Sequence, residues 1–356
     1  MSGDAGSDRP TPPVDWSVAV GTGQRLARGG PTVEPAEARA VVQELREINS
    51  TAELHVRELT GLGAGLPLRP AEVLDRPGWV KAAVAGLSAM TDGALPAGYS
   101  GPLAGVLAGT AGAQAGMVLA FLSSRVLGQY DPFGGEDNSG RLLLVAPNVV
   151  AAQRAMQVSG ADFRLWVCLH ECTHRLQFTA VDWLRDYFAG EVAQLLANID
   201  ESALDAVARL PEMVRTARER SRAGMTGSGP IGLIELLQSP EQRAVLDRLL
   251  ALSTLLEGHA DHVMDAVGPE VVPSVAVIRQ RFSVRRKGGG LLDRALRTLL
   301  GVEAKVRQYA EGAAFTDHIV GAVGMDGFNA VWTSPETLPT RAEIADPGEW
   351  LRRVHG

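Results

Sequence analysis

The pattern His-Glu-x-x-His at residues 170–174 constrains the fold of this chain more than any other feature. It lies within residues 161–180, a strongly apolar segment that contains no proline or glycine and predicts a helix. Residues four apart lie one above the other on an α-helix, so His170 and His174 can direct two imidazole rings at one point. Two polar rings in an apolar stripe need partners, and one zinc ion satisfies both.

Glu171 is the candidate catalytic residue of this motif. On the helix it stands beside the metal rather than on it, where a carboxylate can accept a proton from water activated by the ion. The alternative is a pair of hydrogen-bonded core histidines, with Glu171 pairing with Arg175 on the helix surface. Short motifs also arise by chance, so the motif alone leaves both interpretations open.

A third metal ligand is predicted in a second helix, residues 247–267. Glu257 and Asp261 lie four apart on one face of it, while leucines occupy a different face. Burying an acidic pair on an otherwise apolar helix is costly unless a cation receives it. We therefore predict that Glu257 binds the zinc ion, and that Asp261 accepts the second N–H of one zinc-bound histidine. The alternative is a solvated acidic face.

Three segments around these residues carry a resemblance to a known family. The runs LHECTHRLQF, LLEGHADHVMDAVGP and LLGVEAKVRQYAEGAAF resemble the zincin-like type 2 metallopeptidases of actinobacteria and related bacteria, and the similarity extends from about Trp16 to the closing LPTRAEIADPGEWLRRV. The resemblance implies a mainly α (α+β) zincin-like fold with a small sheet beside the HExxH helix. It also implies a Zn²⁺ site in which His170, His174 and Glu257 are ligands and Glu171 is the general base.

Two points limit what the resemblance implies. Family members are sometimes labelled as associated with deazaflavin coenzyme biosynthesis, and no residue of this chain indicates that chemistry. The separation between His174 and Glu257 is longer than in the best-known gluzincins, and it requires an inserted helical region.

Residues 141–146 form a short apolar run between a turn-rich segment and Pro147, which predicts a strand. Zincins typically place an edge strand beside the metal-binding helix, where an extended peptide can pair with its free edge. The run is either that edge strand or an ordinary buried strand.

The domain organisation is predicted to be simple: residues 1–13 form a disordered tail and residues 14–356 a single domain. Within it, residues 14–128 form a helical N-terminal part and residues 129–356 the part with the metal site. Further helices are predicted at 35–59, 181–199, 201–222 and 291–310. Residues 222–230 predict a flexible linker that can cover the cleft as a flap. The basic loop at 285–290 is either an anion-binding loop or a solvated turn.

Composition excludes some classes of partner. The net charge of −7 and the pI near 5.6 argue against nucleic acid and against an anionic membrane surface. The N-terminus lacks the basic start and apolar core of a signal peptide, so we expect a cytoplasmic protein. Residues 103–124 carry no charge and are just long enough to span a bilayer, but they are rich in glycine and alanine. We expect a buried helix whose glycines permit close helix contact.

The remaining candidate residues are assigned supporting roles. Cys168 and Cys172 point away from the histidine face by the helical period and are expected to be inert core thiols. His259 and His262 lie on other faces of their helix than Glu257 and are expected to be structural histidines. Tyr309, His318 and Arg281 are candidates for stabilising an oxyanion, and their spacing selects none of them.

The function predicted from these residues is metal-assisted hydrolysis, with a peptide as the expected substrate. Two other classes stay open: a zinc-stabilised binding or scaffold protein without turnover, and a hydrolase of a small amide or ester. The sequence does not indicate the identity of the substrate or the oligomeric state.

Overall fold

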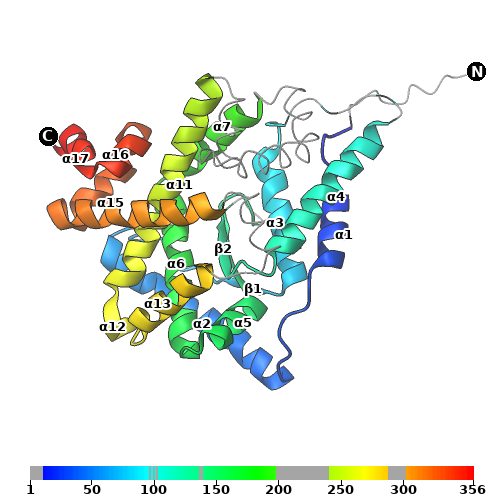
Figure 1. Cartoon of the computed structure of the whole chain (residues 1–356), viewed down its shortest axis with the longest axis horizontal. Coiled ribbons are helices and arrows are strands. Elements are labelled where there is room, and N and C mark those ends of the chain that lie inside the picture. Colours follow the sequence, from blue (N-terminus) through cyan, green and yellow to red (C-terminus); the bar gives the residue numbers. More distant parts are fainter. Residues whose placement is uncertain are drawn as a thin grey trace, which may run out of the picture. The chain divides into compact units, whose positions relative to one another are not determined.

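The computed structural model describes residues 11–95, 98, 101, 103–135, 139–197, 240–287 and 302–356. These residues are mostly helical, with one small sheet, which confirms the predicted mainly α (α+β) class (Figure 1). The α-helices are α1 (Trp16–Leu26), α2 (Pro35–Thr60), α3 (Arg76–Thr91), α4 (Ala104–Leu122), α5 (Ala146–Met156), α6 (Gly160–Ala180), α7 (Leu184–Ala197), α11 (Pro240–Ala266), α12 (Gly268–Val271), α13 (Val275–Lys287), α15 (Val302–Phe328), α16 (Arg341–Ala345) and α17 (Pro347–His355). The strands are β1 (Glu72–Leu74), β2 (Gly128–Asp131) and β3 (Arg141–Val145), and two 3₁₀ helices follow α15, η1 (Asn329–Trp332) and η2 (Pro335–Thr337).

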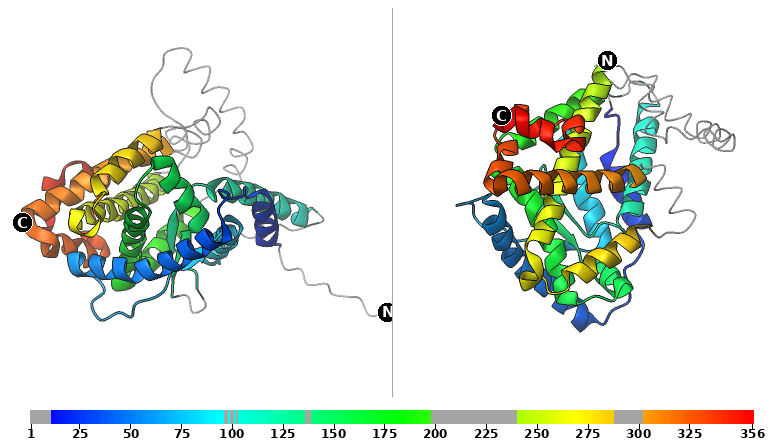
Figure 2. Two further views of the ribbon diagram at one scale, coloured as in Figure 1. Left: turned by 90° about the horizontal axis from the view of Figure 1, so that it is seen from below. Right: turned by 60° about the vertical axis from the view of Figure 1, so that its left-hand side comes forward.

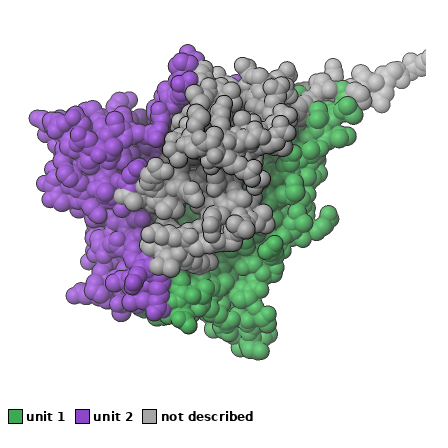
Figure 3. Space-filling view, viewed as in Figure 1, with its two compact units in different colours: residues 1–53, 67–175 green, residues 54–66, 176–356 purple. Residues whose placement is uncertain are grey.

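The chain divides into two compact units, coloured separately in Figure 3. Unit 1 comprises residues 1–53 and 67–175, and unit 2 comprises residues 54–66 and 176–356. Two helices cross the boundary between the units, since α2 and α6 each contribute residues to both of them. The prediction of a single domain over residues 14–356 stays a prediction.

The sheet of unit 1 has three strands in the order β1-β3-β2. β3 pairs parallel with β1 and antiparallel with β2, and Leu142 to Val145 are fully buried. The predicted strand at residues 141–146 is therefore confirmed. Of its two predicted roles, the ordinary buried strand is correct and the edge strand is wrong, because β3 is the central strand and β2 is an edge instead. The four consecutive buried residues explain this, since a continuous apolar run suits a strand covered on both faces.

Helices α1 and α4 of unit 1 pack closely against each other (Figure 1). Asp15 caps the N-terminus of α1 by accepting hydrogen bonds from the backbone N–H groups of Ser17 and Val18. A Cβ atom on Gly112 would collide with the backbone oxygen of Asp15, and one on Gly116 with that of Ala19. The close helix contact predicted for these glycines is confirmed.

The expectation that residues 103–124 are buried holds only on the side of α4 that faces α1. By length and composition α4 is apolar enough to cross a membrane, yet only 28% of its most apolar window is buried inside the protein. Among the residues that the structure describes, it is the one helix that meets this test. The side that carries Gly112 and Gly116 is covered and the opposite side is exposed, a distinction that the composition of the segment does not reveal.

Unit 2 is built around the long helices α11 and α15, which lie against each other in the views of Figures 1 and 2. A Cβ on Gly258 would collide with the backbone of Gly312, and one on Gly312 with the carbonyl oxygen of Thr254. The two backbones can approach this closely because neither glycine carries a side chain. The core beside this crossing is apolar and includes Leu252, Leu255, Phe315, Ile319, Phe328 and Trp350.

The predicted helices at 35–59, 161–180, 181–199 and 247–267 correspond to α2, α6, α7 and α11. The helix predicted at 291–310 overlaps α15, which begins at Val302 and continues to Phe328. The predicted helix at 201–222, the linker at 222–230, residues 288–290 of the basic loop and most of the N-terminal tail lie outside the described residues.

Candidate metal centre

Helix α6 brings the two histidines of the motif together. The Nε2 atoms of His170 and His174 lie 3.2 Å apart, and the two rings meet edge to face with centroids 4.6 Å apart. Both side chains are half-buried, while Phe163, Trp166 and Leu169 around them are buried. The rings therefore interrupt an apolar stripe, as the sequence predicted.

The core side of α6 carries the two cysteines. Cys168 and Cys172 are fully buried, and the Sγ–H of Cys172 donates to the backbone oxygen of Asn49. Burial raises the pKa of both thiols because the interior disfavours the thiolate form. Their expected character as core thiols agrees with this environment.

Arg175, directly after the second histidine, is also a core residue. Its guanidinium donates to Glu53 of α2 at 2.6 Å, and both side chains are almost fully buried. The alternative in which Arg175 pairs on the surface of the helix is therefore wrong. A buried ion pair of this kind ties α6 to α2 within unit 1, since breaking it would leave a charge without compensation.

Glu257 supplies the third candidate ligand from α11. One ligand atom from each of His170, His174 and Glu257 lies within 4.8 Å of the others. In the part of the chain that the structure describes, this is the one group of His, Cys, Asp and Glu side chains with such an arrangement. Each of the three residues was selected from the sequence, although their roles as ligands are not tested.

Gln177 fixes the position of this part of α11 against the end of α6. Its side-chain Nε2 donates to the backbone oxygen of Leu256 at 3.0 Å and lies 3.0 Å from Nδ1 of His259. Gln177 is fully buried, and these contacts provide partners for its amide nitrogen. Leu256 precedes Glu257, and Gln177 lies one helical turn beyond His174. Sequence reasoning missed Gln177, although a glutamine within an apolar helical stretch was a visible signal.

The three side chains fit a zinc ion. Zinc binds imidazole nitrogen at about 2.0–2.1 Å, and two nitrogens on a tetrahedral ion are then separated by about 3.3 Å. The separation of 3.2 Å between the two Nε2 atoms agrees with that value. Two imidazoles and one carboxylate also form a donor set that catalytic zinc sites use, with the fourth position open.

Glu171 is buried against strand β2. Its exposed fraction is 6%, and a Cβ on Gly128 would lie only 2.6 Å from Cγ and 2.7 Å from Oε1 of Glu171. Both residues belong to unit 1. The missing side chain at Gly128 therefore leaves the space in which the carboxylate of Glu171 lies. No pattern in the sequence connects these two residues, which are far apart along the chain.

Asp261 is held by an arginine that the sequence did not single out. Arg279 of α13 pairs with Oδ1 of Asp261 at 3.1 Å, and donates to the backbone oxygen of Asp261 and to Oδ1 of Asp265. Burial acts to lower the pKa of Arg279, but the two carboxylates outweigh it and the pKa is raised. The predicted hydrogen bond from a zinc-binding histidine to Asp261 stays a prediction.

The other histidines of α11 lie in different surroundings. His259 is fully buried and packs on the rings of Phe328 and Trp332. His262 lies 2.6 Å from Asp317 of α15. Neither belongs to the three-residue group, which agrees with their expected structural roles.

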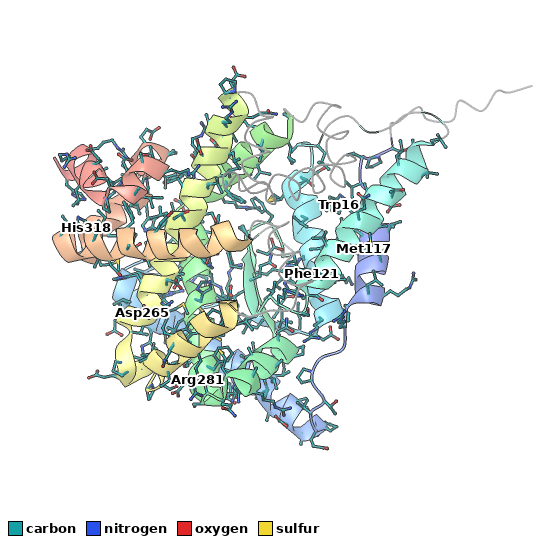
Figure 4. The ribbon with its side chains drawn as sticks, in the orientation of Figure 1. Trp16, Met117, Phe121, Asp265, Arg281 and His318 are labelled. Atoms are coloured by element: carbon teal, nitrogen blue, oxygen red, sulfur yellow. The ribbon has the colours of Figure 1, made fainter. Side chains whose placement is uncertain are left out.

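The candidates for an oxyanion partner remain untested. His318 and Arg281, labelled in Figure 4, are exposed, and the side chain of Tyr309 lies outside the description. The predicted roles of all three residues stay predictions.

Comparison with known proteins decides the family. The family model of zincin-like metallopeptidases matches residues 14–351. The chain belongs to the zincin-like metallopeptidase family. This zincin-like protein is also similar to a crystal structure from Chloroflexus aurantiacus, described as a "putative hydrolase with a novel fold". The two share 30% sequence identity and a TM-score of 0.68, over 96% of this chain and 99% of the other. No curated protein matches the sequence.

The family and this structural relative together support a metallohydrolase. Membership of a zincin-like family implies a metal, usually zinc, and the group formed by His170, His174 and Glu257 is the candidate site for it.

Proposed function

We propose that this zincin-like protein is a zinc-dependent peptidase in which His170, His174 and Glu257 bind the metal and Glu171 is the general base. The observation that carries the proposal is the convergence of two imidazoles and one carboxylate, whose ligand atoms lie within 4.8 Å of one another. Bound zinc supplies a Lewis acid, which polarises a carbonyl group and acidifies water near neutral pH.

Glu171 is suited to move the proton. It follows His170 directly on α6, so its carboxylate lies next to the candidate ligands without belonging to the three-residue group. In the proposed reaction a carboxylate oxygen of Glu171 accepts a proton from the attacking water and returns it to the leaving amine. The contact with Gly128 restricts where that oxygen can lie, which keeps the base in one position.

Asp261 and Arg279 have a positioning role in this proposal. A carboxylate that accepts the second N–H of a metal-binding imidazole selects the tautomer whose other nitrogen is free to bind the metal. The three contacts from Arg279 to Asp261 and Asp265 hold that part of α11 in place. In this proposal Arg279 acts through Asp261.

Strand β2 favours a peptide over a small amide. β2 is an edge strand, and no further strand pairs with it among the described residues. An extended peptide can add to such an edge through main-chain hydrogen bonds. Because Gly128 of β2 lies against Glu171, a peptide paired with β2 would run past the general base. This orientation is the reason we place peptides ahead of small amides and esters.

Replacement of Glu171 by glutamine tests the proposal. The change keeps the size of the side chain and removes its ability to accept a proton, so we expect peptide cleavage to fall by at least about a hundredfold while the metal content stays unchanged. Equal activity in Glu171→Gln would contradict the proposed mechanism. A wild-type protein that binds metal and cleaves no member of peptide, amide and ester libraries would instead indicate a binding or scaffold protein.

Substrate profiling separates the two classes of hydrolase. We expect cleavage of extended peptides, with rates that fall when a backbone N–H of the substrate is methylated, because such a peptide cannot complete its hydrogen bonds with β2. Cleavage confined to short amides or esters would reject the peptidase assignment and retain the metallohydrolase. The cytoplasmic location and the absence of nucleic acid and membrane partners stay predictions.

A further inference from the structure

Helix α4 has an exposed apolar face that the candidate metal centre does not use. Five large apolar side chains on this helix and its N-cap are 44% to 66% exposed, namely Leu103, Val106, Leu107, Met117 and Val118. Scattered single residues of this kind are normal on a protein surface, but a contiguous apolar patch usually marks an interaction site.

The exposed side chains form one continuous stripe along the helix. With 100° of rotation per residue, the stripe covers a face of about 120°. Figure 4 labels two of its members, Met117 and Phe121. The opposite face packs on α1 through Gly112 and Gly116. In order along the helix, the stripe consists of the exposed residues Leu103, Val106, Leu107, Thr110, Gln114, Met117 and Val118, and it ends at the half-buried Phe121, whose ring lies 3.5 Å below the guanidinium of Arg125.

The stripe has a polar centre and two apolar ends. Thr110 and Gln114 are exposed at the middle of the helix, with three apolar residues on either side. The two halves are equally distant from Gly112 along the sequence. When such a helix pairs antiparallel with a copy of itself, the N-terminal apolar end of one helix lies opposite the C-terminal apolar end of the other. Thr110 of each copy then lies opposite Gln114 of its partner.

We propose that this stripe is a self-association surface, on which two copies of the chain pair α4 against α4 in antiparallel orientation about a two-fold axis at the level of Gly112. The hydroxyl of Thr110 donates to the backbone oxygen of Val106 at 2.8 Å, so its oxygen remains able to accept a hydrogen bond. The side-chain amide of Gln114 in the second copy can donate to it. Because the two copies are related by a two-fold axis, the dimer contains this contact twice.

The charge of the chain favours a second copy on this face. Two molecules that each carry a net charge of −7 repel over most of their surfaces. Residues 103–124 contain no ionisable side chain, and the nearest charge, Arg125 over the ring of Phe121, lies at one end of the stripe. The antiparallel arrangement places the two copies of Arg125 at opposite ends, so two copies can meet here without burying like charges. Apolar side chains at both ends of the stripe supply the attraction.

The size of the surface predicts a weak dimer. α4 has 19 residues and is therefore about 28 Å long. One helix face covers less than the roughly 800 Å² per partner that a standard interface buries. We therefore expect a reversible dimer with a dissociation constant in the micromolar range, on the order of 10 micromolar.

Sedimentation velocity over a range of protein concentrations tests the proposal. The wild-type protein is expected to shift from monomer to dimer as its concentration rises, and Val106→Glu or Val118→Glu to weaken the dimer by at least about tenfold, because each dimer then buries two carboxylates. The matched control is Leu54→Glu, which replaces a comparably exposed leucine on α2 and should leave the dimer unchanged.

A wild-type protein that stays monomeric at all concentrations overturns the proposal, as does a dimer that Val106→Glu and Leu54→Glu weaken equally. Binding to zwitterionic lipid vesicles that Val106→Glu abolishes, without any dimer in solution, would identify a lipid surface as the occupant and also overturn it.

Cysteine cross-linking tests the orientation. The two native cysteines are both buried, so an introduced surface cysteine supplies the accessible thiol. A mixture of Leu103→Cys and Phe121→Cys proteins is expected to form a disulfide-linked pair between the two variants, and Leu103→Cys alone to form none. Cross-linking of Leu103→Cys to itself would show a parallel pair and contradict the proposed two-fold arrangement.

Discussion

The side-chain amide of Gln177 donates a hydrogen bond to the backbone oxygen of Leu256, 3.0 Å away, within unit 2. Gln177 belongs to the end of α6, one turn beyond His174, and Leu256 precedes Glu257 on α11. This buried contact, together with the one between Gln177 and His259, links the helix of the two imidazoles to the helix of the carboxylate. This link matters because the candidate ligands come from segments that are far apart in the sequence.

Gln177→Met is expected to lower the free energy of unfolding by about 1–3 kcal/mol and to weaken metal binding. Methionine fills a similar volume but donates no hydrogen bond to Leu256 or to His259. Urea denaturation measures the first effect and competition with a chelator the second.

The control for that variant is Gln43→Met on α2, where the glutamine is exposed. We expect it to change stability by no more than about 0.5 kcal/mol. If the two variants have the same stability, Gln177 does not have the structural role assigned to it.

Gly312→Ala is expected to destabilise the protein by about 1–3 kcal/mol, because the added methyl group collides with the carbonyl oxygen of Thr254 and pushes α15 away from α11. Gly321→Ala on the same helix meets nothing within 4 Å and should stabilise by about 0.5–1 kcal/mol. Thermal unfolding of both variants measures the difference. A stabilising effect at both positions would show that the two backbones do not approach as closely as described.

Much of the helical architecture could be predicted from the sequence. Apolar periodicity located both α6 and α2 within one residue at each end, whereas the predicted start of α11 at residue 247 lies well after the observed start at Pro240. The central strand was predicted from a short apolar run that lies between a turn-rich segment and Pro147. β1 and β2 were missed because they are short and only partly buried, so their sequences lack the apolar run that identifies β3.

The candidate ligands were also accessible to sequence reasoning, because helical spacing relates His170 to His174 and Glu257 to Asp261. Their surroundings were not. Gly128 and Arg279 contact Glu171 and Asp261 from distant segments, and only the fold brings them there. The exposure of one face of α4 was missed because glycine and alanine are abundant throughout that helix, so composition does not separate its two sides.

Gly128→Ala is expected to lower kcat by about tenfold to a hundredfold, because a Cβ would occupy the space of the Glu171 carboxylate and displace the proposed base. Metal content should remain at the wild-type level. Steady-state kinetics and elemental analysis measure the two effects. Gly21→Ala, whose added methyl group meets nothing within 4 Å, is the control, and an equal loss of kcat in both variants would refute a role specific to Gly128.

Asp261→Asn is expected to weaken metal binding by about 10- to 100-fold, since an uncharged amide no longer favours the tautomer that binds the metal. Asp265→Asn is the matched control, because Asp265 pairs with the same arginine and lies on the same helix, but its side chain is largely exposed. Titration with zinc in the presence of a competing chelator compares the variants. Equal losses would indicate that both carboxylates act only through Arg279.

The central claim is that one divalent ion binds to His170, His174 and Glu257, and elemental analysis of the purified protein tests it most directly. We expect close to one zinc ion per chain in the wild-type protein and in Glu171→Gln, and almost none in the double variant His170→Ala/His174→Ala with its helical content intact. A folded double variant that retains the wild-type amount of zinc would contradict the claim, as would a wild-type protein that binds no divalent metal when zinc is supplied.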